Sequence, residues 1–313
     1  MTTNTQAVYV PLWRVRLNLF AKSLRNNWAL FSENPIGVIG LGVIAFFGLF
    51  ALMHPILMNT VWEDKVYNPV NGFDMEIAFH PSPPSARHLL GTDPMGRDVF
   101  SQLMYSTRYE FALGIIAAVV TVVIATTIGA VAAYYGGVID TLFMRLADLV
   151  IMIPFLPILI VLGSLMDIGM LQLALVIGIL SGLGGNTIVI KSQALTIKVK
   201  PYIEAARIAG GGDWHIIFAH MMPNLMPISL LYMMFIVTGA IFSEAVLSYF
   251  GLTTIEMSWG LMINTTQVFG YIMRFDTWWL LIPASLAITF LCAAFYMTGR
   301  ALDEVVNPRL RRR

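Results

Sequence analysis

The 313-residue sequence predicts an all-α integral membrane protein with six transmembrane helices. Three observations carry this prediction: 58% of the residues are hydrophobic, only 12% are charged, and the apolar residues stand in continuous runs. A soluble domain carries about 25% charged residues, so the charges here are too few to cover a soluble fold of this length. A run of about 20 apolar residues crosses the hydrocarbon as a helix, whereas barrel strands would alternate apolar and polar residues.

The charge and cysteine content narrows the possible functions. The net charge of +1 provides no basic surface for phosphates, which disfavours nucleic-acid binding. The single cysteine, Cys292, excludes an internal disulfide framework and a multi-cysteine metal site. His215 and His220 are five residues apart and do not share a helix face well, so they are poor candidates for metal ligands. We therefore expect this chain to bind no metal and no cofactor.

The six expected spans follow the apolar runs in chain order. They cover residues 35–57, 109–134, 140–165, 168–190, 225–250 and 278–300. The second has an uncharged core, and the third contains Pro154 and Pro157, where we expect a bend because proline interrupts helical hydrogen bonding. Only a few residues separate the third span from the fourth, so a re-entrant hairpin would produce a similar pattern there.

The distribution of lysine and arginine predicts that both termini are cytoplasmic. With the N-terminus inside, 14 of the 19 basic residues lie in inner segments. An excess of basic residues marks the cytoplasmic loops of membrane proteins. The outer loops hold only Lys65, Arg87, Arg97, Arg108 and Arg274.

The two terminal segments flank a transmembrane domain of residues 35–300. Residues 1–34 are expected to be a basic cytoplasmic segment rather than a cleaved signal, because no small-residue cleavage site follows the first apolar run. Their apolar residues recur at helical spacing, which favours an amphipathic helix on the membrane surface, although an ordinary basic flank would explain them equally well. The recurring residues are Trp13, Leu17, Phe20 and Leu24. Residues 301–313 form a basic cytoplasmic tail.

Three loops are long enough to carry function. They are the outer loops 58–108 and 251–277 and the inner loop 191–224. The first outer loop contains His80 and His88, which we expect only to shape an exposed loop. The inner loop has the more informative sequence.

In the inner loop, Pro201 suits the first turn of a helix, and the three glycines at 210–212 are expected to end it. Asp213 is a good N-cap for a second short helix, which Pro223 is expected to stop. We therefore expect two short surface helices joined by a flexible glycine corner. Such an element suits the docking of another protein and holds no catalytic group.

The segment Glu204-Ala205-Ala206, followed by Gly210, the apolar residues 216–218 and Pro223, resembles the EAA loop of bacterial ATP-binding-cassette importer permeases. In that family the loop forms the coupling helix, which sits in a cleft of the ATPase subunit. The family usually has one glycine followed by Ala-Ser before the Asp-Trp pair, where this chain has three glycines. The resemblance implies that the ATPase contact involves Glu204, Ala205, Ala206, Arg207, Gly210, Asp213, Trp214 and Pro223.

Further blocks narrow the resemblance to the dipeptide/oligopeptide permeases. Residues 91–93 and 96–101 are similar to that family's GTD-x-x-GRD-x-x-S signature. Third-span residues, the stretch 243–260, and residues 307–311 also follow its pattern, with Asn307 for the usual aspartate. The third-span residues are Asp140, Met144, Arg145, Asp148 and Pro154. The resemblance covers nearly the whole chain from Asn34 onward. It implies a type I ATP-binding-cassette importer permease fold and the second of the family's two permease subunits.

The resemblance also implies an assembly. Its members pair with a second, homologous permease subunit, two ATPase subunits that bind ATP and Mg, and an extracytoplasmic solute-binding protein. No G-x-x-x-x-G-K-[ST] motif occurs in this chain, so we expect a non-catalytic subunit in a bacterial or archaeal plasma (inner) membrane, surrounded by lipid. Peptides are the expected substrate class, with oligosaccharides or another solute as alternatives.

Three charged residues of the expected spans are singled out as candidates: Arg145, Asp148 and Glu244. Arg145 and Asp148 are three residues apart and share a helix face, so we expect a structural ion pair rather than a substrate site. Glu244 lies near the outer end of the fifth span, where it could contact substrate or serve packing and gating. Asp148 and Glu244 are the only acids that we expect to be buried.

The outer-loop residues just before the second span are also candidates. They could cap the helix and pair locally, or stabilise an outer gate or meet a solute-binding protein. These residues are Asp93, Gly96, Arg97 and Asp98.

Three other function classes remain open. A secondary, ion-coupled transporter would need no ATPase, but it typically has inverted repeats and helices broken near the midplane, and no convincing repeat occurs here. An intramembrane enzyme would need a catalytic pair, and Asp148 and Glu244 are expected towards opposite faces of the membrane. A channel would conduct without a partner.

Overall fold

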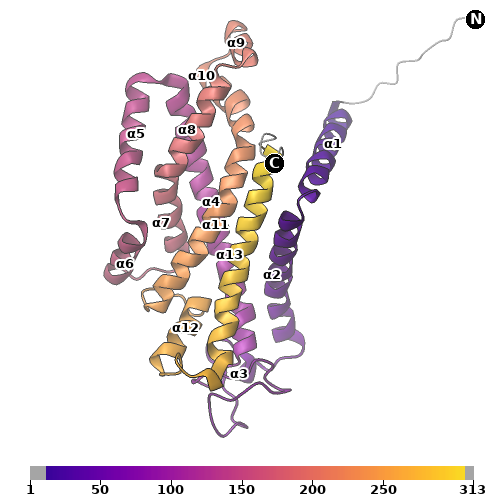
Figure 1. Ribbon diagram of the computed structural model, residues 1–313, viewed down its shortest axis with the longest axis vertical. Coiled ribbons are helices and arrows are strands. Elements are labelled where there is room, and N and C mark those ends of the chain that lie inside the picture. The colour runs from indigo at the N-terminus through magenta and orange to yellow at the C-terminus, as the bar shows by residue number, and fades with distance from the viewer. Residues whose placement is uncertain (1–11, 307–313) are drawn as a thin grey trace, which may run out of the picture.

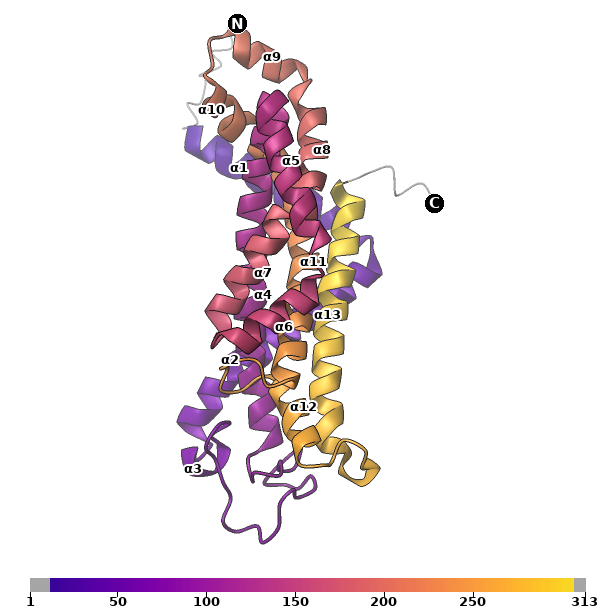
Figure 2. The same cartoon turned by 90° about the vertical axis from the view of Figure 1, so that its left-hand side faces the viewer.

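The computed structural model describes residues 12–306, which form an elongated bundle of helices without a strand in that range (Figures 1 and 2). Long helices dominate the bundle. They are α1 (Leu12–Ser32), α2 (Pro35–Thr60), α4 (Val99–Tyr135), α11 (Met222–Tyr249) and α13 (Trp278–Val306). We call the end that carries α9 the inner end and the end that carries α3 and α12 the outer end, following the predicted orientation.

Four helices are long and apolar enough to cross a membrane, and two bent pairs raise the number to six if each is one span. The first pair is α5 (Gly137–Met152) and α6 (Phe155–Leu165), with a bend of 77°. The second is α7 (Met170–Leu183) and α8 (Gly185–Lys198), with a bend of 44°. The bend predicted at Pro154 is confirmed. Ile153 is extended, as the residue before a proline is expected to be, and this ends α5.

Helix α4 lies at the centre of the bundle, against α7, α8 and α11 (Figure 1). Its buried positions are mostly small, and they allow neighbouring backbones to approach closely. The fully or almost fully buried alanines of α4 are Ala117, Ala118, Ala125, Ala130, Ala132 and Ala133. Small residues on the partners complete the contact: Gly178 of α7 lies against Val120, and Thr121 donates a hydrogen bond to the Gly178 carbonyl at 3.2 Å.

The inner loop differs in part from the prediction. Helix α9 (Pro201–Ile208) forms as expected, and α10 (Asp213–His215) begins at Asp213 with Gly212 as its N-cap residue. Pro223 was predicted to stop a separate second helix, but this is wrong. The chain continues through a π-helical segment, η1 (Ile216–Met221), into α11 as one helix over Asp213–Tyr249.

The π-helical turn of η1 explains how Pro223 is accommodated inside this helix. Proline lacks an N–H group and clashes with the carbonyl four residues earlier in a regular helix. The N–H of Met222 bonds the carbonyl of Ile217, five residues earlier, so the backbone is already wider where Pro223 enters.

The outer segments are also more helical than predicted. Helix α4 begins at Val99, well before residue 109, because the carboxylate of Asp98 accepts the Ser101 N–H at 2.6 Å and caps the helix. The first outer loop therefore covers residues 61–98 and includes α3 (Asp64–Tyr67). The second contains α12 (Trp259–Val268) and the short 3-10 helix η2 (Phe275–Thr277).

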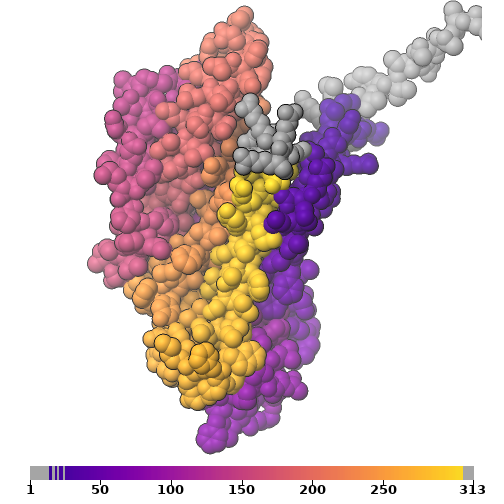
Figure 3. Space-filling model, viewed as in Figure 1, coloured from indigo at the N-terminus to yellow at the C-terminus, as the bar shows by residue number. Residues whose placement is uncertain are grey.

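The described residues cover only part of the predicted N-terminal segment and C-terminal tail. Helix α1 extends over most of the predicted N-terminal segment, but the side chains of the recurring apolar residues and residues 1–11 lie outside the described part. Helix α13 continues beyond residue 300, and the tail block at 307–311 is likewise outside it. Figure 3 shows the face on which α1, α2 and α13 lie side by side, as their contacts also indicate.

Replacing Gly178 with alanine tests the close packing of α4 on α7. A Cβ atom there would lie 2.7 Å from Val120 Cβ and 3.0 Å from the Ala117 carbonyl oxygen, so the helices must separate. We expect Gly178→Ala to destabilise the purified chain by about 1–3 kcal/mol, measured as thermal unfolding in detergent. Gly239→Ala, whose Cβ would meet nothing within 4 Å, is the matched control. Equal unfolding temperatures for the two variants would contradict the packing.

Candidate functional site at the inner loop and the outer cap

The inner loop projects from the inner end of the bundle, with α9 at its extremity (Figures 1 and 2). One buried side chain, Ile203, fastens α9 to an apolar cluster that also holds Ile216 and Ile217. Glu204 and Arg207, also on α9, are exposed and form an ion pair with a nitrogen-to-oxygen distance of 3.2 Å. The apolar side chains of the loop are therefore divided between an anchoring face and a free face.

The free face contains small and apolar residues. Ala205 is exposed, whereas the half-buried Ala206 packs against the anchoring cluster. Ile208 is 81% exposed and Trp214 is 58% exposed, although both side chains are largely apolar. Trp214 stacks on Phe218 with ring centroids 5.8 Å apart. Exposed apolar residues grouped on a projecting element mark a surface for another protein.

The glycine corner is a hydrogen-bonded turn rather than a loose hinge. Gly210 has a φ of +85°, which favours glycine, and its N–H donates to the Arg207 carbonyl at 3.0 Å. The Gly211 N–H donates to the Ala206 carbonyl at 3.0 Å. These bonds close the C-terminus of α9, so α9 and α10 hold a defined angle.

Two side chains from α4 and α8 tie the loop to the centre of the bundle. The Tyr134 hydroxyl, at the inner end of α4, donates to Asp213 Oδ1 at 2.7 Å, and the Arg207 guanidinium lies 5.8 Å from the Tyr134 ring centroid. Lys198 donates to the Ala133 carbonyl at 3.0 Å. Asp213, expected as an N-cap, instead accepts the tyrosine hydroxyl. The sequence contains no local signal for this contact, because Tyr134 and Asp213 are far apart in the chain.

The outer-loop candidates form a buried polar cluster. Asp93 pairs with Arg97 at 2.6 Å and also accepts a hydrogen bond from Gln102 at 2.9 Å. Gly96 adopts a φ of +82° between them, which permits the tight turn. Asp98 caps α4. All three charged candidates therefore have local partners.

His88 contradicts its expected role, because it is fully buried rather than part of an exposed loop. Its Nδ1 lies 2.7 Å from Asp98 Oδ2 and its Nε2 lies 3.0 Å from Asp74 Oδ2. A carboxylate only accepts, so both ring nitrogens carry protons and the imidazole is positive. Arg87 also contacts Asp74, at 2.9 Å. We call residues 61–98 the outer cap. The positive side chains of His88 and Arg87 link its carboxylates and hold the outer cap onto the first turn of α4.

These contacts shift the pKa values of the pair in opposite directions. Burial alone would lower the pKa of His88, but the hydrogen bonds that its ring donates to Asp98 and Asp74 outweigh burial and raise that pKa above 6.5. Burial would raise the pKa of Asp74, but hydrogen bonds from the Glu76 backbone and His88, together with Arg87, lower it below 3.8. The charged forms of both residues are therefore favoured in the folded outer cap.

The charged residues of the third span lie on the surface of the chain. Arg145 and Asp148 are 3.4 Å apart on α5 and both are exposed. A second pair, Lys191 of α8 with Asp140 of α5 at 2.5 Å, was not predicted and joins the two bent spans.

The expectation that Asp148 and Glu244 are the only buried acids is wrong. Asp148 is half exposed, whereas Glu110 of α4 is 1% exposed and lies beside Glu244 of α11, which is also 1% exposed. The sequence could have indicated Glu110 as an acid at the edge of an apolar run. Its partner could not be read from the sequence, because it lies on a distant helix.

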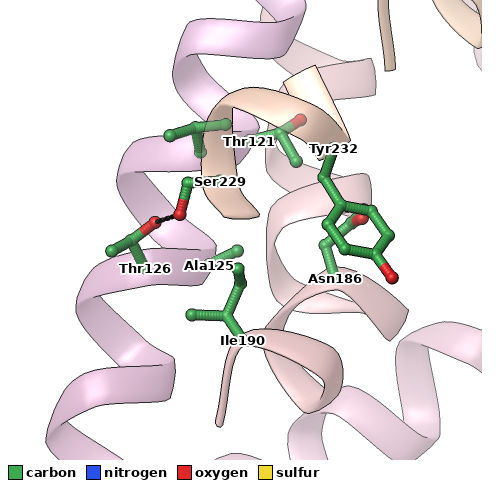
Figure 4. Close-up of a pocket in the computed structure, with 8 residues that line it drawn as sticks. Thr121, Ala125, Thr126, Asn186, Ile190, Ser229 and Tyr232 are labelled. Atoms are coloured by element: carbon green, nitrogen blue, oxygen red, sulfur yellow. Dashed lines mark hydrogen bonds between the residues drawn. The ribbon is translucent and has the colours of Figure 1, made fainter. Parts of the chain in front are cut away.

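A small hollow lies deeper in the bundle, between α4, α8 and α11 (Figure 4). Beside it, the hydroxyls of Thr126 and Ser229 are 2.8 Å apart and join α4 to α11. Asn186 and Tyr232 extend towards the same hollow (Figure 4). Hydroxyl pairs of this kind bind helices together where no water is available.

An apolar helical bundle with four to six candidate spans and a projecting inner loop defines a multi-pass membrane protein. Residues 111–312 match the family model described as the binding-protein-dependent transport system inner membrane component. The chain belongs to this family, and it is a multi-pass plasma membrane protein with an all-α permease fold.

Curated relatives are similar in sequence along nearly the whole chain. The dipeptide transport system permease protein DppC of Bacillus subtilis is 30% identical over 290 residues, covering 91% of this chain and 85% of that protein. The glutathione transport system permease protein GsiD of Pectobacterium atrosepticum is 30% identical, covering 93% and 94%. The oligopeptide transport system permease protein OppC of Haemophilus influenzae is 30% identical, covering 89% and 86%.

The His88 contacts predict a pH dependence of the outer cap. A raised histidine pKa stabilises the folded cap fully below pH 6.5, and this contribution is lost as the pH rises through the raised pKa. We therefore expect the hydrogen-exchange protection of residues 61–98, corrected for intrinsic rates, to fall at alkaline pH. In His88→Gln it should be low throughout and lack this step, whereas the exposed His215→Gln should behave as wild type. Wild-type protection that stays constant would contradict the buried charge.

Proposed function

We propose that this chain is the permease subunit of an ATP-driven, binding-protein-dependent importer. It forms half of the translocation path and couples to an ATPase subunit through the loop of α9 and α10. The proposal rests on family membership together with the geometry of the inner loop. The loop carries a projecting apolar face for a partner, while Ile203 and Tyr134 hold it rigidly to the bundle.

The single observation that carries the coupling proposal is the continuous helix from Asp213 to Tyr249. Its inner end belongs to the proposed docking loop, and its outer end lies beside α12. A helix resists bending and stretching, so a displacement imposed on Asp213 and Trp214 moves the whole of α11. When a partner ATPase closes on ATP and draws two such loops together, the outer end opens; hydrolysis reverses the change. This alternating access needs no catalytic group in the permease.

The proposed partners follow from the same arrangement. ATP and Mg are bound by two separate ATPase subunits, which dock at the inner loops of this chain and of a second, homologous permease. An extracytoplasmic solute-binding protein delivers substrate at the outer end, where the outer cap and α12 lie. Both termini are cytoplasmic in this assembly.

Peptides are the proposed substrate class, because the relatives carry the names dipeptide, oligopeptide and glutathione permease. A groove at the inner end fits a permissive path. It lies between α1, α8, α11 and α13, and mixes amides with apolar side chains. Its described lining includes Asn27, Gln193, Asn224, Met226, Leu230 and the acid Asp303. A path with few charges discriminates weakly between side chains, which leaves oligosaccharides or other solutes as alternatives.

A secondary, ion-coupled transporter is the second candidate function, and the buried acids Glu110 and Glu244 are the observation that favours it. A secondary transporter of this kind would lose uptake when the proton gradient collapses, even while the ATP concentration stays high. Uptake that follows ATP and survives loss of the gradient supports the importer.

Gly210→Asp tests the coupling loop. An aspartate fits the space, because a Cβ there meets nothing within 4 Å, but the φ of +85° strains the backbone and changes the angle between α9 and α10. We expect transport by the assembled system to fall at least roughly tenfold while membrane insertion stays normal. Gly212→Asp, with ordinary φ and equal open space, is the matched control. Wild-type transport by Gly210→Asp would show that the loop does not couple.

Tyr134→Phe tests the bond between the loop and α4. The substitution removes only the hydroxyl that donates to Asp213. We expect ATP hydrolysis by the assembled complex to continue while the amount of solute imported per ATP falls several-fold, because the loop then moves partly independently of α4. Tyr296→Phe, on the exposed face of α13, controls for loss of a tyrosine hydroxyl. An unchanged ratio in Tyr134→Phe would rule out this contact as a transmitting element.

A further inference from the structure

Two carboxyl groups meet inside the protein, where α4 contacts α11 near the outer end. Glu110 and Glu244 are each 1% exposed. Neither oxygen of Glu110 has a hydrogen-bond partner among the described residues, and Glu244 Oε2 has none either. The remaining oxygen, Glu244 Oε1, accepts the Ser248 hydroxyl at 2.5 Å. Three buried oxygens are thus left, and the polar groups that face Glu110 include the Glu244 carboxyl and the Trp259 backbone.

No described cation neutralises the pair. Arg108, two residues before Glu110, turns instead to the Tyr105 ring, with its guanidinium carbon 4.8 Å from the centroid. The titratable groups that face Glu110 are Glu244 from α11 and the Cys292 thiol from α13, and α12 contributes only the backbone of Trp259. Two ionised carboxylates at such a place would repel each other without any compensating charge.

A single proton resolves both difficulties. One carboxyl becomes neutral and donates an O–H to the other, which removes the repulsion and supplies the missing hydrogen bond. The bond then joins α4 to α11. Helix α12 lies directly over it, because a Cβ on Gly260 would lie 2.5 Å from the carbonyl oxygen of Ala245, the residue after Glu244. The Trp259 indole N–H fixes the start of α12 to the Leu103 carbonyl of α4 at 3.1 Å.

We propose that Glu110 and Glu244 share one proton, which latches α4 to α11 while the outer end is closed and passes to the outer water when α12 lifts. The opening that admits solute also admits water, and hydration allows both carboxylates to ionise. Opening is therefore linked to the release of one proton, and an acidic outer medium holds the outer end closed. The protonation itself stands on the chain alone, whereas its role in gating rests on the proposed function.

The protonation is tested on the purified full chain by infrared spectroscopy, through the carbonyl stretch of a neutral carboxylic acid and its shift in heavy water. We expect wild type at neutral pH to show this band with the intensity of one carboxyl group, and Glu110→Gln/Glu244→Gln to lack it. The exposed Glu256→Gln in the second outer loop should keep it. If the wild-type band is no stronger than that of the double variant, both acids are ionised. If its intensity corresponds to two carboxyl groups, both acids are neutral. Either result overturns the shared proton.

The gating role is tested with the same band in the assembled transporter, trapped with a non-hydrolysable ATP analogue. We expect the band to disappear in the trapped state and to return when nucleotide is removed. A complex that forms and binds nucleotide but keeps the band overturns the latch and leaves the importer function intact. Failure to recover any ATPase with the chain overturns the proposed function instead, while the band of the isolated chain still decides the shared proton.

Discussion

The close packing of α4 is the constraint on which the other contacts of the molecule depend. Its alanines and the facing glycines of its neighbours remove the side-chain volume that would otherwise separate the helices. In a bilayer there is no hydrophobic gain from pairing apolar helices, so such close van der Waals contact and hydroxyl pairs such as Thr126 with Ser229 must hold them together. Because α4 has 37 residues, the same helix reaches from the outer cap to the inner loop.

Each polar contact of functional interest is made at a different level of this helix. Asp98 caps its outer end and binds His88, Glu110 meets Glu244 further in, and Tyr134 holds Asp213 at the inner end. The continuous helix over Asp213–Tyr249 runs alongside and shares two of these contacts. The inner loop is therefore tied to both helices, and the helix over Asp213–Tyr249 runs from that loop to the region covered by α12.

Composition and hydropathy predict the spans well, because crossing hydrocarbon requires long apolar helices, and Pro154 marks a bend that the structure contains. Helix ends were predicted less well. The capping carboxylate of Asp98 extends α4 into the expected loop, and a π-helical turn carries the chain past Pro223. Asp98 was a candidate cap, but the sequence did not set the start of the helix at Val99, and nothing in the sequence indicated the π-helical turn.

The candidate site, like the fold, could be predicted only in part from the sequence. The inner loop was recognisable because its residues are contiguous, whereas the residues that anchor it were not. Tyr134 contacts Asp213, and Glu110 contacts Glu244, across long separations in the chain, so only the packing of α4 brings them together. His88 was misjudged for the same reason: its two carboxylate partners, Asp74 and Asp98, lie 14 and 10 residues away in the chain.

The central claim is that this chain transmits the work of an ATPase across the membrane. The most direct measurement is to tag its C-terminus, extract it from native membranes in mild detergent, and identify the co-purifying proteins by mass spectrometry. The account predicts one or two ATP-binding-cassette ATPases and a second permease of similar topology. A homo-oligomer without any ATPase, from an extraction that preserves known complexes of this class, would contradict it.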